Sequence, residues 1–142
     1  MKSLLVAVLS LLLACPARLV VAGDDNRRLV ELPERMQQHM LSNMRDHLAA
    51  INEILEYMAD DQPEKAAEVA EYRLGMSSLE AHGAEHMSAF MPAEMREAGT
   101  AMHRAASQFA LAAQQGEPLP AYRALSRVTS ACVACHAGFR LR

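Results

Sequence analysis

Four segments of this chain carry apolar residues at helical spacing, and this periodicity restricts the fold more than any other feature. The segments cover about 33–60, 63–82, 92–115 and from 120 to near the end of the chain. Steps of three and four residues place the apolar side chains on one face of a helix. No segment shows the alternation of a strand, and Gly or Pro separates the four segments. The sequence therefore predicts an all-α domain, folded as an antiparallel four-helix bundle.

Each predicted helix has an apolar stripe that we expect to face the core. The stripe of the second segment is thin, and the stripe of the fourth includes two cysteines. Small Ala and flexible Met residues suit a plain core, but they also suit packing around a large rigid group. In chain order, the stripes are Leu41, Met44, Leu48, Ile51, Leu55 and Met58; Ala67, Ala70, Leu74 and Ser78; Met91, Met95, Ala98, Met102, Ala105 and Phe109; and Ala121, Leu125, Val128, Cys132, Cys135 and Phe139.

The first residues of the chain predict export. Lys2 precedes an apolar run over residues 4–13, which is typical of a secretory signal and too short to span a bilayer. Small residues before Gly23 predict cleavage after Ala22, so that 1–22 is a signal peptide and 23–142 is a periplasmic domain without a membrane span. In the alternative interpretation, Cys15 is lipidated and anchors the protein to a membrane.

The charge of the predicted mature domain argues against a nucleic-acid partner. Loss of Lys2 and Arg18 with the leader takes the formal net charge from −3 to −5. An acidic domain repels nucleic acid and favours protein partners with basic docking faces. Several arginines are nevertheless expected to form a local positive patch near the end of the chain. They are Arg123, Arg127, Arg140 and Arg142.

The chemistry of the chain is concentrated in one short motif, Cys132-Val133-Ala134-Cys135-His136. Cys-x-x-Cys-His is the attachment signature of c-type haem, in which two thiols form thioethers with the haem and the imidazole coordinates iron. Residues three apart share one face of a helix, so both sulfurs can reach one edge of the porphyrin. The motif predicts one covalent haem c, held by Cys132 and Cys135, with His136 on the iron.

Two other uses of the motif fit the sequence less well. A Cys-x-x-Cys redox dithiol normally stands at the start of a helix that follows a strand, whereas this motif ends a predicted helix. A structural zinc site needs four ligands, and the motif offers three in an unsuitable geometry. Haem attachment remains the favoured prediction.

The four predicted helices and the final residues together resemble the cytochrome c prime family, including its low-spin members. The resemblance covers residues 23–142, but its specificity comes from the last eleven residues. It implies that His136 is the proximal ligand and that the first helix covers the opposite face of the haem. Arg140 would lie near the haem edge. The chain departs from the family because it has no Trp and no arginine one turn before Met44.

The resemblance leaves the sixth iron ligand open. A Met on the first helix would give a low-spin electron carrier, and we predict Met44 because it lies on the apolar stripe of that helix. Met40 is the second candidate, and His47 is a third if the helix is rotated. Leu41 would instead leave the iron five-coordinate and able to bind small gases. We therefore predict an electron carrier that is not an enzyme, with redox proteins and a second copy of the chain as partners; a gas-binding cytochrome c prime is the alternative.

A second constellation supports a different class of function. Histidines and methionines in an exported protein can bind soft copper ions, which gives a haem-free copper-binding four-helix protein as another alternative. The simpler interpretation places the methionines in the core and the histidines at the surface or against the backbone. The residues are His82, His86, Met87, Met91, Met95, Met102 and His103.

Overall fold

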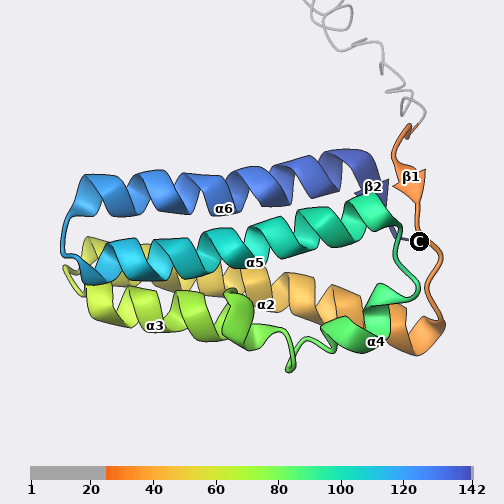
Figure 1. The fold of residues 1–142 in the computed structure, drawn as a ribbon, viewed down its shortest axis with the longest axis horizontal. Coiled ribbons are helices and arrows are strands. Elements are labelled where there is room, and N and C mark those ends of the chain that lie inside the picture. The colour runs from red at the N-terminus through yellow and green to blue at the C-terminus, as the bar shows by residue number, and fades with distance from the viewer. Residues whose placement is uncertain (1–24, 142) are drawn as a thin grey trace, which may run out of the picture.

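The computed structural model describes residues 25–141 and consists mainly of helices (Figure 1). Four helices lie side by side: α2 (Glu34–Ala59), α3 (Pro63–Arg73), α5 (Ala93–Gln114) and α6 (Pro118–Gly138). The shorter elements are η1 (Met76–Ser78), α4 (Ala84–Ser88), and strands β1 (Arg28–Leu29) and β2 (Phe139–Arg140). The predicted all-α class is confirmed for the part of the chain that the structure describes.

The predicted second helix is too long. α3 ends at Arg73, and the chain turns at Gly75, whose N–H donates to the carbonyl oxygen of Ala70 at 2.7 Å. A Cβ at Gly75 would lie 2.7 Å from the backbone oxygen of Glu71, so this tight turn requires glycine. The residues after the turn form η1 and then α4 in place of further α3. Apolar periodicity does not reveal this break. Leu74 before the turn and Ser78 after it are both buried, so the stripe continues across Gly75 as it would in one helix.

The two short strands also differ from the prediction of a strand-free chain. β1 and β2 pair in parallel, with Arg28 opposite Phe139 and Leu29 opposite Arg140. The N–H of Val30 extends the ladder by donating to the carbonyl oxygen of Arg140 at 2.9 Å. A ladder of two residues is too short to leave an alternating pattern in the sequence. It joins the two ends of the described chain immediately after α6.

Small side chains dominate the interior at the end of the molecule where α5 leads into α6. Phe109, Ile54, Leu74 and Val128 are fully buried there and fill the spaces between the helices. Alanine at most of the remaining interior positions allows the helices to approach closely. The buried alanines are Ala50, Ala66, Ala67, Ala70, Ala105, Ala106, Ala110, Ala113, Ala121 and Ala124.

The predicted buried face of α2 is correct only in part: Ile51 and Met58 pack against the core, but two leucines of the stripe do not. Leu48 is 73% exposed and Leu55 is 45% exposed, although both belong to the apolar stripe of this helix. The helix is rotated so that its inner face contains polar residues. Its buried residues are Met40, Asn43, His47, Ala50 and Ile54. On this inner face, Asn43 donates to the carbonyl oxygen of His82 at 3.0 Å, and the ring of His47 contacts the rings of His82 and His103.

The predicted signal peptide, residues 1–22, and the alternative lipid site Cys15 lie outside the described residues. Arg142 also lies outside them. Within residues 25–141, no helix has both the length and the apolar character needed to cross a bilayer.

The position of the core predicts that two side-chain truncations on α5 change the free energy of unfolding by different amounts. Phe109→Ala should lower the free energy of unfolding by about 3–5 kcal/mol, because a fully buried ring leaves a cavity. Leu111→Ala on the same helix should change it by less than about 0.5 kcal/mol, because Leu111 is 63% exposed. Urea unfolding measured by circular dichroism compares the two variants. Equal losses would contradict the placement of the core.

Candidate functional site

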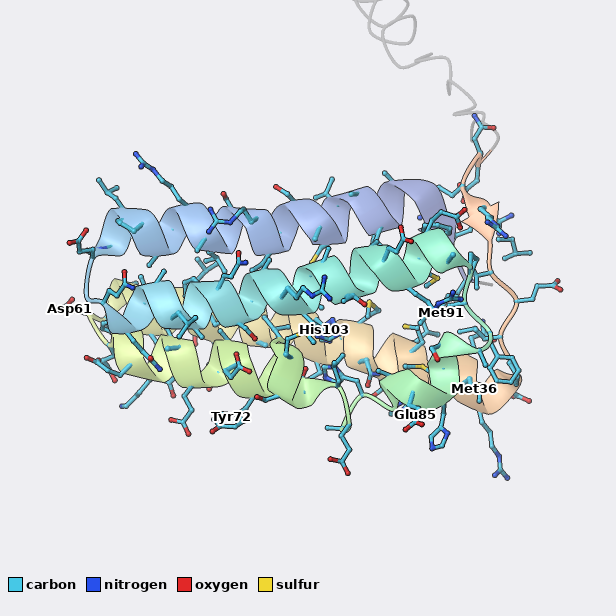
Figure 2. The ribbon with its side chains drawn as sticks, viewed as in Figure 1. Met36, Asp61, Tyr72, Glu85, Met91 and His103 are labelled. Carbon is cyan, nitrogen blue, oxygen red and sulfur yellow. The ribbon has the colours of Figure 1, made fainter. Side chains whose placement is uncertain are left out.

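A pocket of about 360 Å³ opens at the end of the molecule opposite the alanine-rich core. It is bounded by α2, α4, α5 and the last turn of α6. Figure 2 shows Met91 close to this end and His103 further along α5. Thioether side chains form most of the apolar lining, which therefore has flexible and polarizable walls. They belong to Met40, Met44, Met87, Met91, Met95 and Met102.

The Cys-x-x-Cys-His motif forms the last turns of α6 beside this pocket. Cys135 and His136 line the pocket, whereas Cys132 is half-buried against the main core. The helix continues from Pro118 through the whole motif, so the two sulfurs share one face because they are three residues apart. His136 is exposed at the rim. Cys135 and His136 are thus brought to the wall of one pocket, and Cys132 lies one helical turn before them, beside the main core.

Both cysteines are in environments that favour the neutral thiol. Burial raises the pKa of Cys132 and of Cys135, and the neighbouring Cys132 raises the pKa of Cys135 further. Reactive dithiols need the opposite shift, because the thiolate is the nucleophile. Neither cysteine is in a disulfide. The environment therefore does not favour the redox-dithiol interpretation of the motif.

The chain before α2 holds the end of α6 in place. Arg27 donates a hydrogen bond from Nη1 to the carbonyl oxygen of His136 at 3.4 Å. Asp25 pairs with Arg27 at 2.8 Å and with Arg140 at 3.4 Å. Together with the pairing of β1 and β2, these contacts fix the residues that follow the motif. Arg27 and Arg140 both line the pocket, so two cations lie beside it.

All four residues considered for the far side of the haem, Met40, Leu41, Met44 and His47, lie on the pocket wall contributed by α2. Met40 is buried, and Leu41 and Met44 are half-buried. Met44 packs on the methionine-rich cluster that also contains Met40 and Cys135. The structure thus brings the predicted ligand Met44 to the same pocket as His136, and it leaves Met40, Leu41 and, with the helix rotated, His47 there as alternatives.

Three buried histidines form a cluster at the inner end of the pocket, and sequence analysis did not predict it. The ring of His47 lies 4.8 Å from that of His82 and 5.9 Å from that of His103, between ring centroids. The rings of His82 and His103 are 5.5 Å apart. Each residue is only 8% exposed. We call these three residues the histidine cluster.

Hydrogen bonds fix the orientation of two members of the cluster. Nδ1 of His103 donates to the carbonyl oxygen of Leu74 at 2.7 Å, so in the neutral ring Nε2 carries no hydrogen. Ser78 donates its hydroxyl hydrogen to Gly75, so Nδ1 of His82 must donate to Ser78 Oγ, at 3.3 Å. Nε2 of His82 is therefore also an acceptor. Nε2 of His47, in contrast, is buried without a hydrogen-bond partner.

The three rings are neutral at physiological pH because burial disfavours the charged form. Burial, together with the neighbouring His82 and His103, lowers the pKa of His47 to about 4. Burial likewise lowers the pKa of His82 and the pKa of His103. Asp46, beside His47, is held by Arg73 in an ion pair. The sequence contained one indication of this buried cluster. His47 lies seven residues after Met40 and therefore on the same face of the helix.

The predicted copper constellation is divided by the structure. His82, His103 and four of its methionines line the pocket, but His86 is exposed and does not. Within residues 25–141, no group of three or more His, Cys, Asp or Glu side chains is arranged to hold a metal ion. The prediction of histidines at the surface or against the backbone is correct for His86, which is exposed, and for His103, which bonds to the carbonyl oxygen of Leu74. It is wrong for the ring of His82, which is buried and bonds to the hydroxyl of Ser78.

The arginines of the predicted positive patch do not all lie at the pocket. Arg140 lines the pocket, whereas Arg123 and Arg127 are exposed nearer the start of α6 and do not line it. Arg27, which sequence analysis did not single out, takes a place at the pocket instead.

Comparison with known proteins leaves the family open. No protein-family model, no curated protein and no solved structure matches this chain at a significant level. The resemblance to the cytochrome c prime family therefore rests on the residues of this chain and stays a prediction.

The histidine cluster predicts acid sensitivity. The pKa of His47 is about 4 in the folded protein, below the ordinary histidine value of 6.5. His47 therefore takes up a proton at a higher pH in the unfolded chain than in the folded protein. As a result, the free energy of unfolding is greatest above about pH 6.5 and falls as the pH drops towards about 4. His47 alone should contribute a loss of about 2–3 kcal/mol.

Urea unfolding at about pH 7 and about pH 4.5 measures this effect. His47→Gln should reduce the acid-induced loss, whereas the exposed-site control His86→Gln should leave it unchanged. An equal loss in the protein and in His47→Gln would show that His47 does not account for the sensitivity.

Proposed function

We propose that this protein is a c-type cytochrome that carries single electrons on one covalently attached haem. The observation that carries this proposal is the position of Cys135, His136 and Met44 on one mostly apolar pocket. Cys132 is half-buried one helical turn before Cys135, on the same face of α6. A haem needs an apolar site, two nearby thiols and axial ligands on opposite sides, and these residue types supply all three.

The four side-by-side helices support a more specific arrangement. We propose an antiparallel four-helix bundle of the cytochrome c prime type, with the haem attached near the end of α6. In that arrangement, α6 contributes the attachment residues and α2 contributes the opposite wall. The segment between α3 and α5 closes the side that the short α3 leaves uncovered.

Each residue of the site then has a defined task. The thiols of Cys132 and Cys135 form thioethers to the two vinyl groups and fix the haem on α6. His136 would hold the iron through a ring nitrogen. Met44 would hold it through its thioether, and a His/Met ligand pair raises the reduction potential of a haem. The haem supplies the one-electron chemistry, and the methionine walls exclude water from it.

The location and partners follow from the same proposal. Covalent haem attachment and the predicted leader are consistent with a periplasmic protein, with lipidation at Cys15 as the alternative. The partners would be redox proteins that dock near the exposed end of α6. Arg27 and Arg140 beside the pocket favour an acidic docking face on such a partner, in contrast to the basic face expected from net charge alone.

Haem attachment is tested by expressing the protein with the cytochrome maturation machinery. Haem should stay bound under denaturing conditions in the wild type and should be lost from Cys132→Ala/Cys135→Ala. The control Val133→Ala, an exposed position between the cysteines, should keep its haem. Haem that separates from the wild-type protein on denaturation would contradict covalent attachment.

The same preparation distinguishes the alternatives. A low-spin ferrous spectrum that resists carbon monoxide supports the electron carrier. A high-spin spectrum that changes with carbon monoxide supports the gas-binding protein. Stoichiometric copper in a colourless preparation supports the copper-binding protein.

The outward face of α2 is proposed as the contact with a second copy of the chain. Leu48 and Leu55 are exposed there, with Arg45 and Glu56 at either end. The pair Leu48 and Leu55 and the pair Arg45 and Glu56 have midpoints one residue apart on this face. Two copies of α2 crossing in opposite directions would therefore place Leu48 against Leu55 and Arg45 against Glu56, the self-complementary pattern of a two-fold interface.

Sedimentation analysis of the holoprotein tests this contact. Leu48→Glu should raise the dimer dissociation constant at least about tenfold, because it buries a charge in the interface. Leu111→Glu, at an exposed leucine of α5, should not change it. A wild-type protein that is monomeric at all concentrations would contradict the proposed contact.

A further inference from the structure

His47 occupies a position that the proposed electron-carrier function does not yet use. It lies one turn after Met44 on α2, about 4.5 Å further along the helix axis. Both residues line the pocket that contains His136. The rotation of α2 that exposes Leu48 is the same rotation that turns His47 inward. An imidazole and a thioether thus face the pocket from consecutive turns of one helix.

His47 differs from the other two members of the histidine cluster in how its ring is held. Ser78 and the carbonyl of Leu74 hold the rings of His82 and His103 through Nδ1. No hydrogen bond holds Nε2 of His47, although that atom is buried. A buried nitrogen without a partner costs free energy, so a group that binds it recovers this cost. Rotation of the ring towards the pocket breaks no hydrogen bond at Nε2.

The charges around His47 keep it available as a ligand. Asp46 is the adjacent carboxylate, but its oxygens accept hydrogen bonds from Arg73 of α3. The remaining titratable neighbours in the cluster are His82 and His103, which are neutral because they are buried. His47 is therefore a neutral imidazole, the form of histidine that binds metals.

We propose that His47 is an alternative sixth ligand, which binds the oxidised haem iron when the thioether of Met44 leaves it. This inference rests on the proposed haem-binding function. The exchange breaks the iron–sulfur bond and forms an iron–nitrogen bond, and it transfers no electron or proton. Nitrogen ligands suit ferric iron, whereas a thioether favours the ferrous state and raises the potential. The exchange would therefore convert a high-potential carrier into one with a lower potential.

Four variants of the ferric holoprotein test the proposal by absorption and electron paramagnetic resonance spectra. Met44→Ala should lose the sulfur-to-iron charge-transfer band but stay low-spin, because His47 replaces the thioether. Met44→Ala/His47→Ala should become high-spin. Met44→Ala/His82→Ala is the matched control, because it removes another member of the cluster, and it should stay low-spin. His47→Ala alone should keep the charge-transfer band.

Free imidazole checks that the double variant still has a folded pocket. Its addition to Met44→Ala/His47→Ala should restore the low-spin spectrum. The proposal fails if Met44→Ala is already high-spin, or if Met44→Ala/His47→Ala stays low-spin without added imidazole. Both of these spectra can be recorded only on protein that contains haem, so they would overturn the role of His47 and leave the proposed function standing. A preparation without covalent haem would instead overturn the proposed function.

Discussion

The arrangement of the whole molecule depends on a change in side-chain size along the helices. Where α5 leads into α6, alanines and a few large apolar residues such as Phe109 let the helices pack closely. Towards the other end, methionines and histidines replace the alanines on α2 and α5. α3 ends before this region, and the segment that follows it crosses the gap (Figure 1). One sequence thereby builds both a dense core and a methionine-lined pocket.

The polar wall of this pocket has a cost that its hydrogen bonds largely offset. Asn43 Nδ2 and His39 Nε2 both donate to the carbonyl oxygen of His82, at 3.0 and 2.9 Å. These bonds tie α2 to the turn before α4. A buried nitrogen left without a partner, as in His47, remains uncompensated. Such a feature is common where a protein binds a ligand, and it links the unusual inner face of α2 to the proposed site.

Sequence reasoning predicted the parts of the fold that depend on local periodicity. The extents of α2 and α5 follow from apolar spacing and from prolines at their starts. The break after Arg73 did not follow, because it depends on the close approach of Gly75 to the Glu71 backbone. The orientation of α2 did not follow either. Hydrophobic patterning assigns Leu48 to the core, whereas partners distant in sequence turn His47 inward.

The site was predictable to a similar degree. The spacing of Cys132, Cys135 and His136 identified the proposed attachment residues, because their relation is local to one helix. The opposite wall depends on how α2, α4 and α5 meet, which no single segment determines. Met44 was placed on the pocket by its helix, but the histidine cluster combines residues from three separate parts of the chain.

The most direct test of the account is the intact mass of the wild-type protein, purified from a host that attaches haem to exported proteins. The account predicts a mass greater than that of the polypeptide by one haem, and no thiol that reacts with an alkylating reagent after denaturation. An unmodified mass, with Cys132 and Cys135 both alkylated, would contradict it.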